Sequence, residues 1–200
     1  MRALSPNQKK EVRLNLIVSA ALFLIYTVIY VIGRKSIPFF YYFETAGTLL
    51  LIAVFLHRFR PMYYLGIVAF AGIAQCGGVM FQLYVVIPIY DLLLHLASGV
   101  LLVFMGHYFL DLISRRHTER CIPPTVTLWF SWLFAVASAG VWEIYEFSAD
   151  QFFGLDCQLR SLGEGGLIDT MTDIIMGTGG AVIGVIALAL ILRHESKRQK

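Results

Sequence analysis

The sequence has few charged residues and few cysteines. Only 14% of its 200 residues are charged and 58% are hydrophobic, whereas about a quarter of the residues in soluble domains are charged. This scarcity of charge favours a membrane protein. The three cysteines lack the spacing of a zinc or haem motif, so they predict neither a disulfide framework nor a cysteine metal site.

Several motifs are also absent. No basic stripe with interleaved aromatic residues occurs, so we expect no nucleic-acid partner. The sequence has no Gly-x-Ser-x-Gly nucleophile elbow, no P-loop and no zinc-protease helix. Common soluble hydrolase and nucleotide-binding mechanisms are therefore not indicated.

Six apolar stretches are long enough to cross a membrane, which takes about 20 mostly apolar residues. They cover residues 14–33, 37–57, 62–84, 90–113, 124–150 and 168–193. The first is followed at once by another, which favours a retained helix over a removed signal peptide. The predicted fold is an all-α, polytopic membrane helix bundle with about six transmembrane helices. We expect a single integral membrane domain over residues 1–200.

The basic residues predict the orientation of this bundle. Nearly all Lys and Arg residues fall at the two ends of the chain and in the second and fourth connections; the exceptions are Arg34, Lys35 and Arg160. Connections rich in Lys and Arg face the cytoplasm. Both termini are therefore predicted to be cytoplasmic, which agrees with an even number of spans, and the expected location is the bacterial inner membrane.

Acidic residues gather at the opposite side of the predicted bundle. The fourth and sixth spans start on the extracytoplasmic side and the fifth ends there, which brings together Asp91, His95, Glu143, Glu146, Asp150, Asp169 and Asp173. Within each span these residues are three or four positions apart and so share one helix face. Glu44, roughly 10 Å into the second span, is an additional candidate.

Charges placed this way need a partner. A charge at the bilayer centre costs about 2.5–3.5 kcal/mol, less near the interface, and the spans contain no Lys or Arg around the acids; Arg160 in the outer loop is the nearest cation. Carboxylates with one imidazole suit Mg²⁺, Mn²⁺, Ca²⁺ or Zn²⁺. The sequence predicts a divalent metal site of one or two ions, held by Asp91, His95, Glu143, Glu146, Asp169 and Asp173, with Glu44 and Asp150 as additional candidates.

A simpler explanation covers part of this pattern. Acids in the first turn of a helix interact favourably with the helix dipole, so Asp91 and Asp169 need no ligand, and Asp150 would be a solvated end residue. The dipole does not explain His95 and Asp173, which lie deeper in their spans. It also disfavours Glu143 and Glu146, which lie near a helix C-terminus.

The segments "YDLLLHLASG", "WEIYEFSAD" and "DTMTDIIMGTGGA" resemble the YjdF-type family of uncharacterised bacterial inner-membrane proteins. More distantly they are similar to the VanZ-like family, in which Gln usually stands at the position of Glu146. The resemblance covers roughly residues 40–185. It implies a helical membrane fold with a site at Asp91, His95, Glu143, Glu146, Asp169 and Asp173, and the VanZ-like family is itself linked to the cell envelope. It implies no reaction, because the family has no established activity.

Two classes of function remain compatible with the sequence. One is a metal-dependent enzyme acting on a membrane lipid or lipid-linked phosphate at the outer leaflet, with His95 or Glu146 as general acid or base. The other is a non-catalytic cation-binding, transporter-like or envelope-associated protein, because acids within a membrane also mark ion paths. The sequence indicates neither the substrate nor the oligomeric state.

Overall fold

The computed structural model describes residues 5–33, 39–81, 83–117, 122–158 and 165–198. These ranges contain no β-strand, so the predicted all-α fold is confirmed for them. The elements are α1 (Pro6–Gly33), α2 (Phe39–Leu56), α3 (Pro61–Gly72), the π-helix η1 (Ile73–Met80), α4 (Leu83–Val86), α5 (Tyr90–His117), α6 (Pro124–Phe153) and α7 (Gly165–Arg198).

Four helices are long and apolar enough to cross a membrane: α1, α5 (over Tyr90–Ser114), α6 and α7. A shorter apolar helix covers Tyr42–Leu56. The third predicted range, 62–84, is not one regular helix, because α3 gives way to a π-helix at Ile73 and a separate α4 follows. Side-chain periodicity does not mark this change of hydrogen-bonding pattern.

Proline and glycine set several helix ends. Pro61 and Pro124 occupy the first positions of α3 and α6, where the missing N–H would have had no partner within the helix. Gly154 ends α6 with a φ of 66°, and its amide donates to the Asp150 carbonyl oxygen. This left-handed conformation favours glycine, and it turns the chain away from α6 towards α7.

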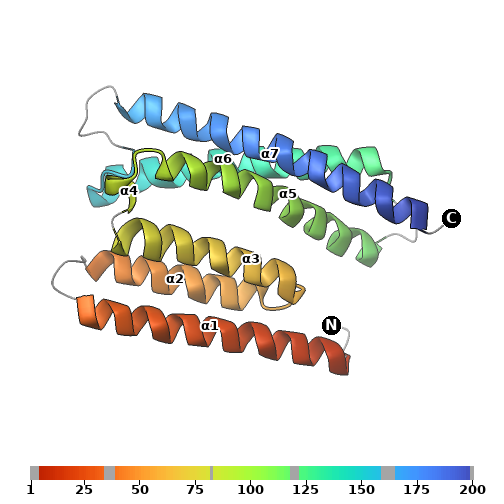
Figure 1. Ribbon diagram of the computed structural model, residues 1–200, viewed down its shortest axis with the longest axis horizontal. Helices are drawn as coiled ribbons and strands as arrows, with labels where there is room; N and C mark the ends of the chain where they lie inside the picture. The colour runs from red at the N-terminus through yellow and green to blue at the C-terminus, as the bar shows by residue number, and fades with distance from the viewer. Residues whose placement is uncertain (1–4, 34–38, 82, 118–121, 159–164, 199–200) are drawn as a thin grey trace. The chain divides into compact units, whose positions relative to one another are not determined.

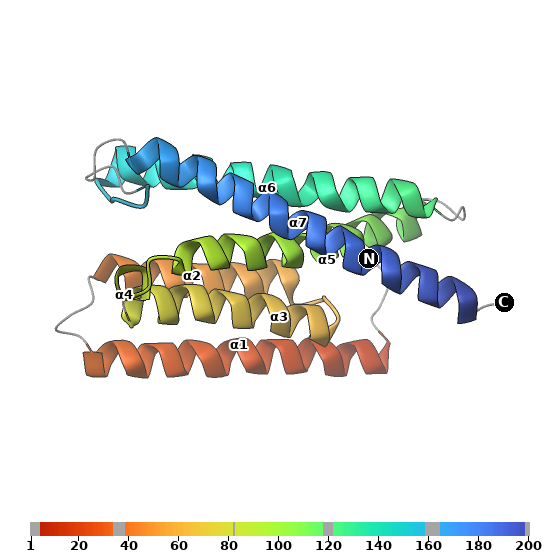
Figure 2. The same cartoon turned by 45° about the horizontal axis from the view of Figure 1, so that its top comes forward.

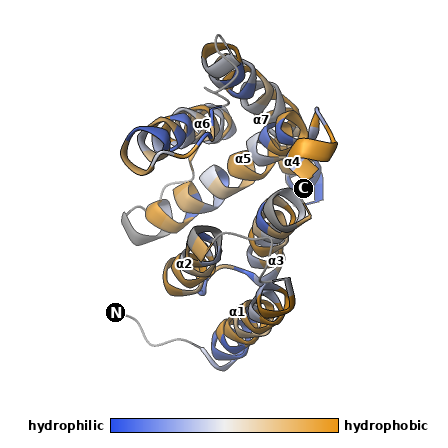
Figure 3. Cartoon of the chain, turned by 90° about the vertical axis from the view of Figure 1, so that its left-hand side faces the viewer, coloured by the Kyte–Doolittle hydropathy of each residue, from blue (hydrophilic) through white to orange (hydrophobic). Residues whose placement is uncertain are grey.

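Helix α6 buries its polar and small residues and exposes its large apolar ones. Its buried stripe contains Ser131, Ala135 and Ala139, followed by the acids, whereas Val141 and Ile144 are 64% and 66% exposed. Figure 3 shows hydrophobic positions on every labelled helix. Lipid accepts exposed apolar side chains, while small residues let membrane helices approach closely. The burial pattern is that of a membrane helix.

The chain forms two compact units, Met1–Tyr90 and Asp91–Lys200. In the first unit α1, α2 and α3 lie side by side (Figure 1). The Asn15 side-chain amide on α1 donates to the carbonyl oxygens of His57 and Phe59, each at 2.9 Å. The Ser19 hydroxyl on α1 forms a hydrogen bond with the Tyr64 hydroxyl on α3. These contacts attach α1 to the connection between α2 and α3. The predicted single domain over residues 1–200 stays a prediction.

The second unit consists of α5, α6 and α7, and α6 and α7 pack against each other (Figure 2). Glycines bring α5 and α7 into backbone contact. A Cβ added at Gly99 would clash with the Gly177 carbonyl oxygen, and one added at Gly180 would clash with that of Leu96. Because these residues have no side chain, the two helices approach more closely than larger residues would permit.

Candidate metal centre

Glu143 and Asp173 each lie one helical turn from a point where all three helices of the second unit meet. A Cβ added at Gly177 on α7 would lie 3.4 Å from Ala139 Cβ on α6 and 3.7 Å from the His95 carbonyl oxygen on α5. Glu143 lies four residues after Ala139, and Asp173 four residues before Gly177. Side chains spaced by four share a helix face. The close contact at Gly177 thus positions His95, Glu143 and Asp173 near one another.

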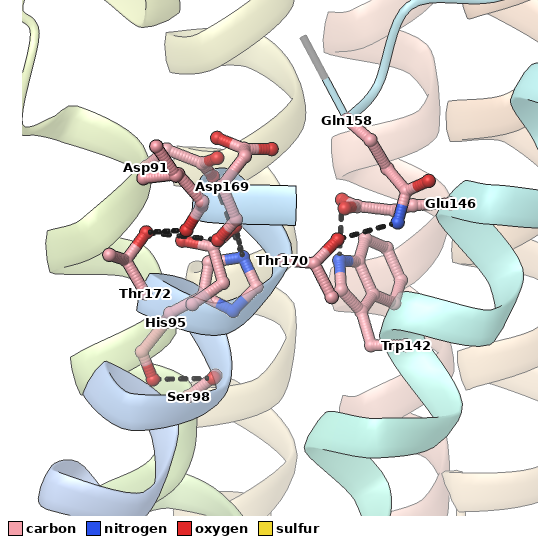
Figure 4. Close-up of polar contacts among 11 residues, drawn as sticks. Asp91, His95, Ser98, Trp142, Glu146, Gln158, Asp169, Thr170 and Thr172 are labelled. Atoms are coloured by element: carbon pink, nitrogen blue, oxygen red, sulfur yellow. Dashed lines mark hydrogen bonds and ion pairs between the residues drawn. The ribbon is translucent and has the colours of Figure 1, made fainter. Parts of the chain in front are cut away.

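The first group of ligand atoms joins α5 and α7. His95 Nε2 lies 3.6 Å from Asp91 Oδ1 and 3.6 Å from Asp173 Oδ2. Both distances are too long for a hydrogen bond. The three ligand atoms nevertheless lie within 4.8 Å of one another, and Figure 4 shows Asp91 and His95 on the same side of the cluster. The arrangement leaves room for an ion between two carboxylates and an imidazole.

The second group joins α6 and α7. Glu143, Glu146 and Asp173 each offer one carboxylate oxygen, and these atoms also lie within 4.8 Å of one another. The Trp142 indole N–H donates to Glu146 Oε1 at 2.8 Å (Figure 4), which fixes the orientation of that carboxylate. Asp173 belongs to both groups.

These carboxylates are buried with little compensation. The exposed fraction is 1% for Asp173, 5% for Glu143 and 9% for Glu146. Among the described residues, neither oxygen of Asp173 or Glu143 receives a hydrogen bond, nor does Glu146 Oε2. The sequence has no Lys or Arg in α5 before Arg115, in α6, or in α7 before Arg193. A buried carboxylate keeps its charge only with a partner, so the cluster must take up protons or cations.

Asp150 has a different role from the one predicted. It is not solvated but 5% exposed, and its carboxylate accepts the backbone N–H groups of Cys157 at 2.7 Å and Gln158 at 3.0 Å. The Gln158 side chain then donates to the Thr170 hydroxyl at 2.7 Å, as Figure 4 shows. Asp150 thus holds the segment after α6 against α7 and lies outside both ligand groups.

Asp169 is close to the cluster but belongs to neither ligand group. Its Oδ2 is buried and accepts no hydrogen bond from the described residues, and the Thr172 hydroxyl donates to its backbone carbonyl oxygen. Glu44 lies on α2, in the other unit, and Arg160 falls outside the described residues. The roles predicted for Asp169, Glu44 and Arg160 stay predictions.

Sequence reasoning missed three side chains around the site. The Trp142 indole N–H donates to Glu146, and Gln158 and Thr170 connect the segment after α6 to α7. The four-residue spacing of Trp142 and Glu146 is a signal that could have indicated the first contact. Gln158 and Thr170 lie twelve positions apart in the sequence, which offers no comparable signal for their contact.

The fold and the cluster define a class: an all-helical membrane protein with long apolar helices and a carboxylate-rich interior. The chain belongs to the family described as "Predicted membrane protein (DUF2238)", which matches residues 12–194. No curated protein and no solved structure matches the chain.

Proposed function

We propose that this protein is a multi-pass inner-membrane protein that binds a divalent cation between α5, α6 and α7. The observation that carries the proposal is Asp173, which is 1% exposed, accepts no hydrogen bond from the described residues and belongs to both ligand groups. The remaining ligands are Asp91, His95, Glu143 and Glu146. A cation would supply the charge compensation that the sequence lacks in these helices.

The donor set limits the identity of the cation. Carboxylate oxygens are the ligands that Mg²⁺, Mn²⁺ and Ca²⁺ prefer. The single imidazole of His95 adds a ligand that suits Mn²⁺ and Zn²⁺ better than Ca²⁺. We therefore expect Mn²⁺ or Zn²⁺ to bind more tightly than Ca²⁺.

The proposed topology has six spans with both termini in the cytoplasm, and it places the cation site at the extracytoplasmic end. The distribution of Lys and Arg supports this orientation. Reporter fusions truncated at Arg160 and at Lys200 test it. The proposal requires an extracytoplasmic signal at Arg160 and a cytoplasmic one at Lys200; the reverse would overturn the orientation.

A reaction compatible with this site is metal-assisted hydrolysis of a lipid-linked phosphate at the outer leaflet. A bound cation polarises a phosphoryl oxygen and activates water, and His95 or Glu146 would move the proton. The Asp91 side chain is 33% exposed, which favours access to that edge of the cluster. The alternative is a cation-binding or transporter-like protein without turnover. It is favoured because the described parts of α5 before Arg115, of α6 and of α7 before Arg193 contain no Lys or Arg that would hold a phosphate.

The family match supports the membrane location and agrees with the resemblance to the YjdF-type family. The more distant VanZ-like resemblance, and with it a role in the cell envelope, stays a prediction. The proposed partners are membrane lipids and a lipid-linked substrate.

Metal analysis of the purified protein tests the proposal. We expect a stoichiometric divalent metal in the wild type, and its loss in His95→Ala and in Asp173→Ala. His194→Ala and Glu195→Gln are matched controls, because both residues are exposed near the end of α7, and they should retain the metal. Failure of the wild type to bind any divalent metal, together with a melting temperature that does not respond to chelation, would reject the proposal.

A comparison of two assays then separates the enzyme from the transporter. Release of phosphate from lipid-linked phosphate in detergent, abolished by His95→Ala, would support the enzyme. Cation or proton flux in liposomes without phosphate release would support the alternative. The matched His194→Ala variant should behave as the wild type in both assays.

A further inference from the structure

We infer that the cluster is a binuclear centre, in which the Asp173 carboxylate bridges two divalent cations. One ion is held by Asp91, His95 and Asp173, and the other by Glu143, Glu146 and Asp173. This inference rests on the proposed function, since it specifies how many cations the same cluster binds and which residues hold each.

The grouping of the ligand atoms is the first argument. Donor atoms around one octahedral ion at about 2.1 Å lie roughly 3.0–4.2 Å apart, and the atoms within each group lie within 4.8 Å of one another. Each group therefore fits one ion after a small contraction. The five side chains gather as two groups and not as one, and Asp173 is the member that both groups share.

The environment of Asp173 also favours a bridging carboxylate. Its side chain is 1% exposed, and both of its oxygens lack a hydrogen-bond partner among the described residues. One of them, Oδ2, lies 3.6 Å from His95 Nε2 in the first group. A carboxylate with two free oxygens can bind a different ion with each of them. Paired metal ions in proteins lie about 3.5–4 Å apart, a distance that one carboxylate spans.

Charge balance is the third argument. When the four carboxylates of the two groups are ionised, two divalent cations neutralise them, whereas a single divalent cation leaves two uncompensated negative charges in the cluster. No Lys or Arg is present in the surrounding parts of α5, α6 and α7. Uncompensated buried charge strongly destabilises a protein, so the neutral arrangement with two ions is favoured.

The two positions differ in chemistry. The first includes the imidazole of His95, which suits Mn²⁺ and Zn²⁺, while the second consists of carboxylates only and suits Mg²⁺, Mn²⁺ or Ca²⁺. Mn²⁺ is thus the probe that both positions accept. Because it is paramagnetic, it also reports whether a second ion lies nearby.

The test is a Mn²⁺ titration of the full-length protein in detergent, followed by measurement of bound manganese and electron paramagnetic resonance. We expect about two ions per chain in the wild type, with a spectrum broadened by coupling between ions about 3.5–4 Å apart. His95→Ala and Glu143→Gln should each retain about one ion and show the six-line spectrum of isolated Mn²⁺. Asp173→Asn should weaken binding at both positions.

A surface variant and two replacement variants separate loss of metal from loss of folding. Glu195→Gln should match the wild type. If His95→Ala is not monodisperse in gel filtration, His95→Gln replaces it. If Glu143→Gln is not monodisperse, Glu146→Gln replaces it. One ion per wild-type chain, lost equally from His95→Ala and Glu143→Gln, would overturn the binuclear centre while leaving the proposed cation site intact. Absence of any bound manganese would overturn both.

Discussion

Replacement of Asp173 by Asn should make the protein insensitive to divalent metal without destabilising the metal-free form. Asn has nearly the same shape as Asp but carries no charge. The Asp173 carboxylate is 1% exposed and lies among further acids without a nearby Lys or Arg. Burying an uncompensated charge costs several kcal/mol, so the metal-free variant should be at least as stable as the metal-free wild type.

The magnitude for the wild type follows from binding linkage. A ligand present at 100 times its Kd stabilises the folded state by about 2.7 kcal/mol. In a protein of 150–250 residues, 1 kcal/mol shifts the melting temperature by about 2–4 °C. One ion should therefore raise the Tm of the wild type by about 5–11 °C, and two ions by up to about twice as much.

The assay is thermal unfolding in detergent, monitored by tryptophan fluorescence, with EDTA and with Mn²⁺. The wild type should gain stability on addition of Mn²⁺, and Asp173→Asn should not. Glu195→Gln, on the same helix, should respond as the wild type does. If the wild type ignores both EDTA and Mn²⁺ while Asp173→Asn melts several degrees lower, then Asp173 stabilises the fold by itself and the reasoning is wrong.

Four further changes test separate parts of the account. Gly180→Val should destabilise the protein by about 1–3 kcal/mol or more, measured as a lower Tm, because its side chain would overlap the backbone of Leu96. Asp150→Ala should cost about 2 kcal/mol of stability, because one buried and one partly buried N–H group lose their acceptor, but should leave the metal content unchanged. Trp142→Phe should weaken metal binding about 10–100-fold in a titration, because Glu146 loses the donor that orients it. Lowering the pH should weaken metal binding in the same titration, because protons compete for carboxylates and imidazole.

Each of these changes has a control or a contrary outcome. A Cβ at Gly140 would meet no atom within 4 Å, so Gly140→Val should shift the Tm much less than Gly180→Val. Loss of metal from Asp150→Ala would show that Asp150 contributes to the centre. Unchanged affinity in Trp142→Phe would mean that its hydrogen bond does not orient Glu146. Tighter binding in acid would contradict ligation by carboxylates.

The sequence predicted the long helices and the grouping of several acids because both depend on local spacing. Glu143 and Glu146 continue a stripe of small residues along α6, and a helical period places them on the same buried face. His95 and Asp173 share helix faces with Gly99 and Gly177, the positions at which α5 and α7 approach closely. The residues that meet across α5, α6 and α7 could therefore be inferred before their distances were known.

Other features depend on contacts that spacing does not encode. Asp150 and Asp169 both appear as acids at a helix end, but only Asp150 binds the turn that follows α6, because that turn folds back onto it. The change from α3 to the π-helix at Ile73 is likewise invisible in the hydrophobic pattern. Such details follow from the path of the backbone and not from residue type.

The cation site between α5, α6 and α7 is the central claim, and anomalous X-ray diffraction from the metal-loaded protein at the manganese absorption edge tests it most directly. A bound cation should give strong anomalous density within about 2.0–2.5 Å of the Asp173 carboxylate, with His95 Nε2 or a Glu143 oxygen completing the coordination. Ordered helices with no anomalous density near Asp173 would contradict that claim.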